Sequence, residues 1–331
     1  MGRVFSGVKP TSDVPHLGNY IGAFRNFVAT QDVHECLFCV VDLHAITVPP
    51  WDPKDLNRRT RRLAASFIAA GIDPSRSTLF VQSDVHHHTD LAWILTCISR
   101  MGELSRMTQY KDKSRGQDQQ GVSVGLFSYP LLMAADILAY QANLVPIGDD
   151  QRQHLELTRD LAERFNREFG ETFPVPDALI AEHGARIMAL DDPTRKMDKS
   201  TEHPQGVIWM DDDEDTVRSK VSRAVTDSGR DVVYSRDKPA IANLLEMFSL
   251  LAGQSIPDLE TRFTGKGYSD FKSALTDTIV EYLTPFQVRF AEVLEDTDQL
   301  DEILDQGAER AQRLASSTMK QVRESIGLRR P

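Results

Sequence analysis

The chain has 331 residues, of which 40% are hydrophobic and 26% are charged, as in ordinary globular proteins rather than disordered or fibrous ones. Its net charge of −11 argues against a protein that binds nucleic acid over its whole surface. No apolar run approaches the roughly 20 residues that span a bilayer, and the first residues lack the pattern of a signal sequence. We therefore expect a cytoplasmic protein with a sizeable core, most simply built as two domains.

Short β-branched runs alternate with helical patterns in the first half of the chain, which is typical of a parallel sheet covered by helices. We predict a Rossmann-like α/β domain here, followed by an all-helical part. Its strands are predicted at Arg3–Val8, Cys36–Asp42 and Thr78–Gln82. Helices are predicted to begin near Gly18, Pro53 and Thr89.

Two groups of residues that could ligate a metal are interpreted as structural. Cys36 and Cys39 lie in a run that is predicted as a buried strand, where residues three apart face opposite sides. His86, His87 and His88 are consecutive, so their side chains point in different directions, and they follow a strand at an expected surface loop. We predict no metal site from the sequence.

The domain organisation follows from changes in composition along the chain. A segment from about 106 to 177 is predicted as an insert over the carboxyl edge of the sheet, with an apolar helix around Leu131–Tyr140. Residues 201–206 are interpreted as a linker, so we place the catalytic domain at 1–205 and a helical domain at 206–331. The last helix is predicted at about Asp298–Ile326.

Charge is unevenly distributed in the helical part. Asp211–Asp215 precedes a helical pattern, where acidic residues favour the positive end of the helix dipole, so we assign it a structural role. The last 22 residues contain only one acidic residue, Glu324, and six basic residues. The basic residues are Arg310, Arg313, Lys320, Arg323, Arg329 and Arg330. This basic tail is either a solvated helix face or a contact for nucleic acid.

Two short motifs have the chemistry of phosphate binding. Pro15–Asn19 follows the first strand and opens a helix, where unpaired N–H groups attract phosphate and His16 and Asn19 add side-chain donors. Lys196–Ser200 carries two lysines three residues apart, whose cations can offset the charge that builds on a departing pyrophosphate. Either motif alone is weak, because a capped helix or a charged loop has the same pattern.

Together the motifs resemble those of the class I aminoacyl-tRNA synthetases. Residues 16–19 are similar to their HIGH motif, with Asn19 where a second His often stands, and residues 196–200 to KMSKS, with Asp198 replacing the first Ser. Further matches over almost the whole chain narrow the resemblance to tryptophanyl-tRNA synthetases of the bacterial type. The matching stretches are Phe5–Gly7, Gly18–Ala23, Asp42–Thr47, Met133–Leu138, Asp150–Asp160 and Gly265–Tyr268.

The resemblance implies an enzyme that activates tryptophan with ATP and transfers it to tRNA(Trp), with Mg²⁺ as the counter-ion of ATP and a homodimer as the assembly. It implies no DNA or membrane partner. The implied catalytic residues are His16, Asn19, Lys113, Lys196 and Lys199. The implied ATP-binding residues are Lys9, Pro10, Thr11, Gly18, Asn19, Gly148, Asp149, Asp150, Ile187, Lys196, Met197, Asp198, Lys199 and Ser200.

Tryptophan recognition requires an apolar slot with one acceptor, because the indole N–H is only a donor. Asp136 suits this role, since Met133 and Asp136 are three apart on a predicted helix and share a face. A pocket built around such a bond can reject phenylalanine by roughly 10⁴ to 10⁵, so no editing domain is needed. The residues that the resemblance assigns to tryptophan are Phe5, Gly7, His44, Tyr129, Met133, Asp136, Val145, Ile147 and Gln151.

Lys9 departs from the commoner family pattern, in which Gln stands at this position. We expect its charge to help hold ATP or the α-phosphate, unless the side chain points to solvent. Three other functions stay open: a tyrosyl-tRNA synthetase, a nucleotidyltransferase that acts without tRNA, and a catalytically idle paralogue that binds or regulates. The context of Asp136 favours tryptophan over tyrosine, the basic tail favours tRNA, and the intact lysines favour an active enzyme.

Overall fold

The computed structural model describes residues 2–114, 122–148, 151–180, 187–198 and 203–329. A parallel sheet lies at its centre, with strand order β3-β2-β1-β4-β5. The strands are β1 (Arg3–Val8), β2 (Glu35–Val40), β3 (Thr78–Val81), β4 (Leu144–Pro146) and β5 (Asp177–Leu179). The predicted α/β class and its first three strands are confirmed, with ends that differ by one or two residues, whereas β4 and β5 were not predicted.

The two faces of the sheet pack against different helices, so its strands are buried on both sides. Phe38 of β2 lies in a core with side chains of α2 and α3, whereas Leu37 lies in a second core with side chains of α4, α7 and α8. Cys36 and Cys39 divide between these cores in the same way, and burial raises the pKa of the Cys36 thiol to about 11. Both cysteines are free and buried, which confirms the packing interpretation.

Among the described residues, eight α-helices belong to the part of the chain that contains the sheet. They are α1 (Leu17–Asn19), α2 (Arg25–Thr30), α3 (Pro53–Ala69), α4 (His87–Ile98), α5 (Met101–Leu104), α6 (Thr108–Ser114), α7 (Val124–Leu138) and α8 (Arg152–Phe169). A π-helical turn at Tyr20–Phe24 joins α1 to α2. The starts follow local chemistry: the Asp52 side chain caps α3 ahead of Pro53, and the Ser123 hydroxyl accepts the N–H of Leu126 at the start of α7.

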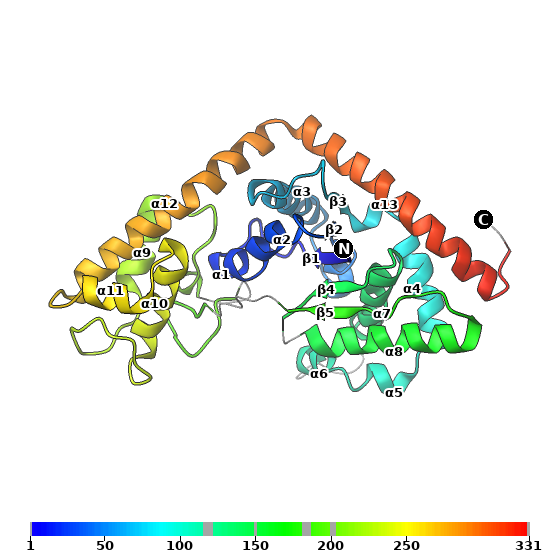
Figure 1. Cartoon of the computed structure of the whole chain (residues 1–331), viewed down its shortest axis with the longest axis horizontal. Helices are drawn as coiled ribbons and strands as arrows, with labels where there is room; N and C mark the ends of the chain where they lie inside the picture. The colour runs from blue at the N-terminus through cyan, green and yellow to red at the C-terminus, as the bar shows by residue number, and fades with distance from the viewer. Residues whose placement is uncertain (1, 115–121, 149–150, 181–186, 199–202, 330–331) are drawn as a thin grey trace.

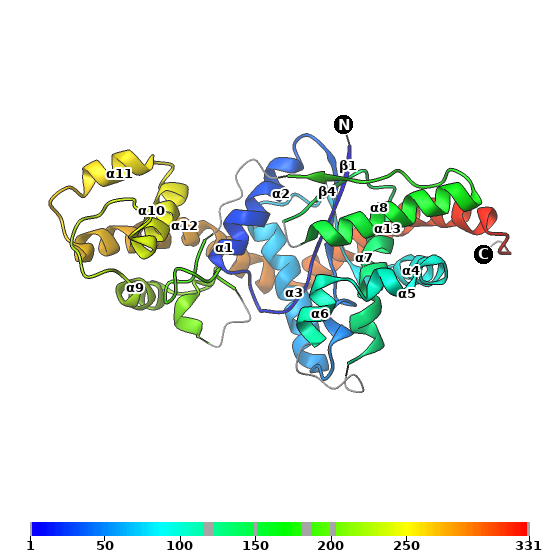
Figure 2. The ribbon, with the colours of Figure 1, turned by 90° about the horizontal axis from the view of Figure 1, so that it is seen from below.

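The remaining helices lie at the other end of the molecule and along its edge (Figures 1 and 2). They are α9 (Glu214–Arg223), α10 (Pro239–Ala252), α11 (Ile256–Arg262), α12 (Tyr268–Glu295) and α13 (Thr297–Ser325). The acidic run before α9 is structural as predicted, because Asp213 accepts the N–H of Thr216 and Asp212 pairs with Lys220 at 2.6 Å. None of the described helices is long and apolar enough to cross a membrane.

The two longest helices connect these regions (Figure 1). α12 runs from the α9–α11 group to α3, and α13 then continues at an angle toward the opposite end of the molecule, packing against β3 and α4. Gly307 of α13 lies so close to β3 that a Cβ there would overlap the carbonyl oxygen of Leu79. Arg310 donates to the carbonyl of Pro74 at 2.9 Å. α13 therefore has the predicted extent, and its middle packs closely against β3 at the edge of the sheet.

Candidate active site

A cavity of about 390 Å³ opens where β1 and β4 end, beneath α7. The strand order reverses direction between these two strands, which is the point where parallel sheets of this kind bind ligands. All nine residues that the sequence assigned to tryptophan contribute to its lining, and so do Lys9 and Asn19 from the set assigned to ATP. The lining also includes residues that were not predicted: Ser6, Val8, Val41, Thr47, Gln109, Ile137 and Pro146.

The deep part of the cavity has apolar walls. Phe5 of β1, Met133 of α7 and Val145 of β4 face one another across it. The end of β1 has no room for a side chain at Gly7, because a Cβ at this position would come within 2.8 Å of the Val41 side chain. The space thus has the apolar character that a large aromatic side chain requires.

Asp136 is the polar group of this apolar part, and it is only 1% exposed. Its Oδ1 accepts from Gln82 Nε2 at 2.7 Å and lies 2.7 Å from His88 Nδ1, while its Oδ2 lies 2.9 Å from His44 Nε2. Burial raises its pKa, but the hydrogen bonds from His44 and His88 outweigh burial and lower the pKa to about 2. The carboxyl group is therefore ionised at neutral pH and acts purely as an acceptor.

The ionised carboxylate of Asp136 determines which ring nitrogen of His44 and of His88 faces it with a proton. Because it only accepts, both imidazoles present an N–H to it. Nε2 of His88 lies 2.7 Å from the hydroxyl of Tyr140, which is buried one turn beyond Asp136. Tyr140, His88 and Asp136 form a buried chain of hydrogen bonds that ends at the cavity.

The interpretation of residues 86–88 as a surface loop is wrong for two of the three histidines. α4 begins at His87, and His88 points into the core with none of its surface exposed. The tight turn at Gln82–Asp84 brings α4 directly onto the carboxyl end of β3, so one residue of its first turn must face inward. Gln82, His88 and Tyr140, which support Asp136 from behind the lining, are further residues that were not predicted, and the spacing of four between Asp136 and Tyr140 was the available signal.

The mouth of the cavity is polar. Tyr129 of α7 lies 2.6 Å from His154 Nε2 and donates to Gln109 Oε1 at 3.2 Å. Burial raises the pKa of Tyr129 to about 12, so its hydroxyl stays protonated. Gln151 precedes α8 and completes this side of the lining. These neutral donors and acceptors can orient a zwitterionic amino acid without adding charge.

The two phosphate motifs meet beside the cavity. His16 precedes α1 and its Nδ1 accepts the N–H of Asn19, so the ring acts as a helix cap. A Cβ on Gly18 would lie 3.6 Å from the Ile187 side chain, and Met197 donates its N–H to the carbonyl of Ile187 at 3.0 Å. Ile187 and Met197 are buried and anchor the loop that exposes Lys196.

Several residues of the predicted ATP set are not brought into the lining of the cavity. Pro10 and Thr11 follow β1, Gly148 is exposed after β4, and Lys196 and Asp198 are exposed beyond the Ile187 pairing. Asp149, Asp150, Lys199 and Ser200 lie outside the described residues, as does the side chain of Lys113 in α6. Their assignment to ATP stays a prediction.

Comparison with known proteins identifies the family. A family model described as "tRNA synthetases class I (W and Y)" matches residues 2–284. Tryptophan–tRNA ligase 2 of Streptomyces avermitilis is 52% identical over 98% of this chain and 96% of its own. Tryptophan–tRNA ligase of Caldanaerobacter subterraneus is 50% identical over 99% of both chains.

The chain belongs to the bacterial tryptophanyl-tRNA synthetases of class I. Solved tryptophanyl-tRNA synthetases share the fold: that of Mycoplasma pneumoniae has a TM-score of 0.89 at 35% identity and covers 99% of this chain and 98% of its own. The tryptophanyl-tRNA synthetase of Campylobacter jejuni, complexed with ADP and tryptophan, has a TM-score of 0.86 at 36% identity, covering 98% and 100%. The family predicted from the motifs is confirmed.

Proposed function

We propose that the chain joins the carboxylate of L-tryptophan to the α-phosphate of ATP, releases pyrophosphate, and then transfers the tryptophanyl group to tRNA(Trp). This proposal is supported chiefly by Asp136, a buried acceptor that is ionised at neutral pH in an apolar cavity at the switch point of the sheet. The names of the full-length relatives support the same activity, that of a tryptophan–tRNA ligase.

Recognition of the indole follows from the donor count around Asp136. Gln82, His44 and His88 donate to the carboxylate, which has about four acceptor positions, so one position remains for the indole N–H. Phe5, Met133 and Val145 would cover the faces of the ring. Phenylalanine would leave the acceptor without this partner in a site closed to water, which costs far more than the loss of contact area.

Adenylation requires positioning and charge rather than a protein nucleophile, because the substrate carboxylate itself attacks the α-phosphate. Tyr129 and Gln151 would hold the amino and carboxylate groups at the mouth of the cavity. Lys9 also lines the cavity, and we expect its cation to face the α-phosphate. Lys196 and Lys199 would then stabilise the charge on the departing pyrophosphate.

Magnesium would enter with ATP. Lys9 and Asn19, the described lining residues at the ATP side, supply a cation and an amide, which suit phosphate oxygens. Mg²⁺ prefers oxygen ligands and keeps several waters, so phosphate oxygens and water would form most of its coordination shell. The ion would neutralise phosphate charge while the lysines orient the reacting groups.

The tRNA, the assembly and the location follow from the family. The basic tail of α13 is our candidate contact for the tRNA backbone, and residues 206–331 are our candidate tRNA-binding domain. A homodimer in the cytoplasm is the expected assembly and location, and the mass in solution tests the dimer. Mutations in these regions should affect tRNA charging while leaving adenylation intact.

The test is ATP–pyrophosphate exchange with single amino acids, followed by charging of tRNA. Tryptophan should support exchange, and tyrosine and phenylalanine should support at least 10³-fold less, since each lacks a fitting ring N–H. Charging of tRNA(Trp) with tryptophan should follow. Exchange with tyrosine would make the chain a tyrosyl enzyme, exchange without charging would make it a nucleotidyltransferase, and neither activity would make it an idle paralogue.

A further inference from the structure

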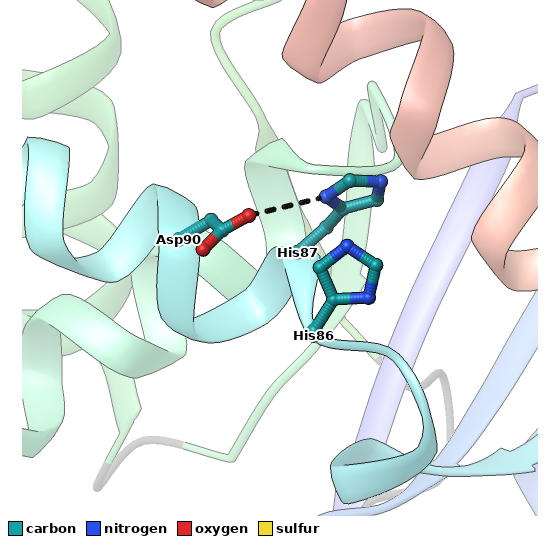
Figure 3. Close-up of side chains that lie close together, drawn as sticks. All are labelled: His86, His87 and Asp90. Atoms are coloured by element: carbon teal, nitrogen blue, oxygen red, sulfur yellow. Dashed lines mark ion pairs between the residues drawn. The ribbon is translucent and has the colours of Figure 1, made fainter. Parts of the chain in front are cut away.

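Two histidines and one aspartate gather at the start of α4, outside the cavity. His86 is the residue before α4, His87 is its first residue, and Asp90 follows one turn later. One ligand atom from each residue lies within 4.8 Å of the other two (Figure 3). Among the described residues, this is the one such group of histidine, cysteine, aspartate or glutamate side chains.

His87 is held in place by the opposite helix. Its Nε2 lies 3.0 Å from the Ser316 hydroxyl and 3.1 Å from the Gln312 amide nitrogen, both on α13. Its Nδ1 points the other way, toward Asp90 at 3.5 Å, and is buried without a hydrogen bond in the part of the chain that is described (Figure 3). The ring is thus oriented by α13 and presents one nitrogen to the cluster.

The contacts on α13 can select the tautomer that a metal requires. Gln312 Oε1 is buried without a hydrogen bond among the described residues. Half a turn of this amide exchanges its oxygen and nitrogen, so that Oε1 accepts from an N–H on Nε2 of His87. Nδ1 then carries the lone pair toward Asp90. An outer N–H fixed by a neighbouring oxygen is how metal-ligating histidines are generally oriented.

The spacing of the three side chains suits coordination of one ion. Tetrahedral bonds of about 2.0–2.1 Å place two ligand atoms about 3.3 Å apart, close to the 3.5 Å between His87 Nδ1 and Asp90 Oδ2. His86 is exposed and its ring centre lies 4.2 Å from that of His87, so a side-chain rotation brings it to the same ion.

We propose that His86, His87 and Asp90 form a binding site for one divalent transition-metal ion of the zinc class. Two imidazoles and one carboxylate are a ligand set that Zn²⁺ accepts, with water in the fourth position, whereas Mg²⁺ disfavours imidazole. The ion would stabilise the first turn of α4, because it would bind His87, whose ring is oriented by contacts with α13. It is separate from the magnesium of ATP, and adenylation does not depend on it.

Calorimetric titration of the untagged, chelator-treated full chain with Zn²⁺ tests the site, with Co²⁺ absorption as a report of tetrahedral ligation. We expect one equivalent to bind and the melting temperature to rise with zinc. His86→Asn and Asp90→Asn should each weaken binding at least tenfold and remove the zinc-dependent rise. The metal-free variants should melt as the metal-free wild type does and retain pyrophosphate exchange.

Cys97 provides the matched control. It is an exposed thiol on the same helix, seven residues after Asp90 and so roughly 10 Å away, and it could bind zinc by itself. Cys97→Ser should bind one equivalent with unchanged affinity. The proposal is overturned if the wild type shows no saturable binding, if either the His86 or the Asp90 variant binds within tenfold of it, or if Cys97→Ser loses the ion.

Discussion

At the scale of single residues, three segments of the chain hold the carboxylate of Asp136 through Gln82, His44 and His88. Asp136 and His44 were predicted because a donor-only indole needs an acceptor and because both lie in family motifs. Gln82 and His88 come from the turn after β3 and the start of α4, and their contact with Asp136 depends on how these segments meet in space. Periodicity along one helix carries no information about such a contact.

The ionised state of Asp136 predicts an acid dependence of stability. Its pKa is lowered from 3.8 to about 2 in the fold, so the stabilisation is present above pH 4 and is lost as the pH falls toward 2. The shift corresponds to about 2 kcal/mol in total, of which about 1 kcal/mol should be lost by pH 3. Urea unfolding of the wild type and Asp136→Asn should show their free energies of unfolding converge by this amount below pH 4. A difference that stays constant down to pH 3 would contradict the assignment.

His88 is a positioning residue, because it acts on the indole only through Asp136. His88→Leu removes a hydrogen bond to a charged group, worth about 1.5–3 kcal/mol, so the KM for tryptophan in pyrophosphate exchange should rise roughly 10-fold to 100-fold. The KM for ATP should change little. His88→Asn keeps a donor near the position of Nδ1 and should recover most of the loss. Equal effects of the two substitutions, or equal changes in both KM values, would indicate a merely structural role.

At the scale of elements, long periodic segments were predictable and short ones were not. β1 and α13 match their predicted bounds to within a residue, because a buried strand and a long amphipathic helix have clear patterns. β4 and β5 have three residues each and β4 ends in a proline, so neither has a readable period. α7 begins well before the predicted apolar stretch, since Pro130 interrupts its pattern.

The packing of α13 on β3 predicts a contrast between two helical glycines. Gly307→Ala would force a methyl group against the Leu79 carbonyl, so helix and strand must separate, at a cost of about 1–3 kcal/mol in the free energy of unfolding. Gly102 of α5 has no atom within 4 Å of its added Cβ, and Gly102→Ala should be neutral or stabilising by roughly 0.5–1 kcal/mol. Chemical denaturation measures both. Equal effects would mean that α13 is not closely packed on the sheet.

At the scale of the whole molecule, an acidic protein has to bind an acidic tRNA. A net charge of −11 repels the polyanion in general, so we expect the contacts with tRNA to be local, and the tail on α13 is the candidate for them. Arg310 is engaged with the carbonyl of Pro74, whereas Lys320 is exposed and Arg323 is half-buried. The sequence showed the excess of charge, but only the fold separates anchoring cations from those at the surface.

Neutralising part of the tail should weaken tRNA binding and flatten its salt dependence. For Arg323→Gln combined with Arg329→Gln, the slope of log K against log salt should fall by roughly 0.7–0.9 for each residue that meets a phosphate. Lys54→Gln combined with Arg167→Gln, two exposed cations elsewhere, is the matched control and should leave the slope unchanged. Pyrophosphate exchange should persist in both proteins. An unchanged slope in the tail variant would make the tail a solvated helix face.

If the buried anion of Asp136 selects tryptophan, its removal must change the ratio of kcat/KM for tryptophan and phenylalanine in pyrophosphate exchange. Asp136→Asn keeps the shape of the side chain but removes its charge and replaces an acceptor oxygen with a donor. We expect this ratio to fall by roughly 10²-fold to 10³-fold, mainly through the loss of tryptophan activity, in a protein that still folds. A ratio within threefold of the wild type would show that the apolar walls, and not the carboxylate, choose the substrate.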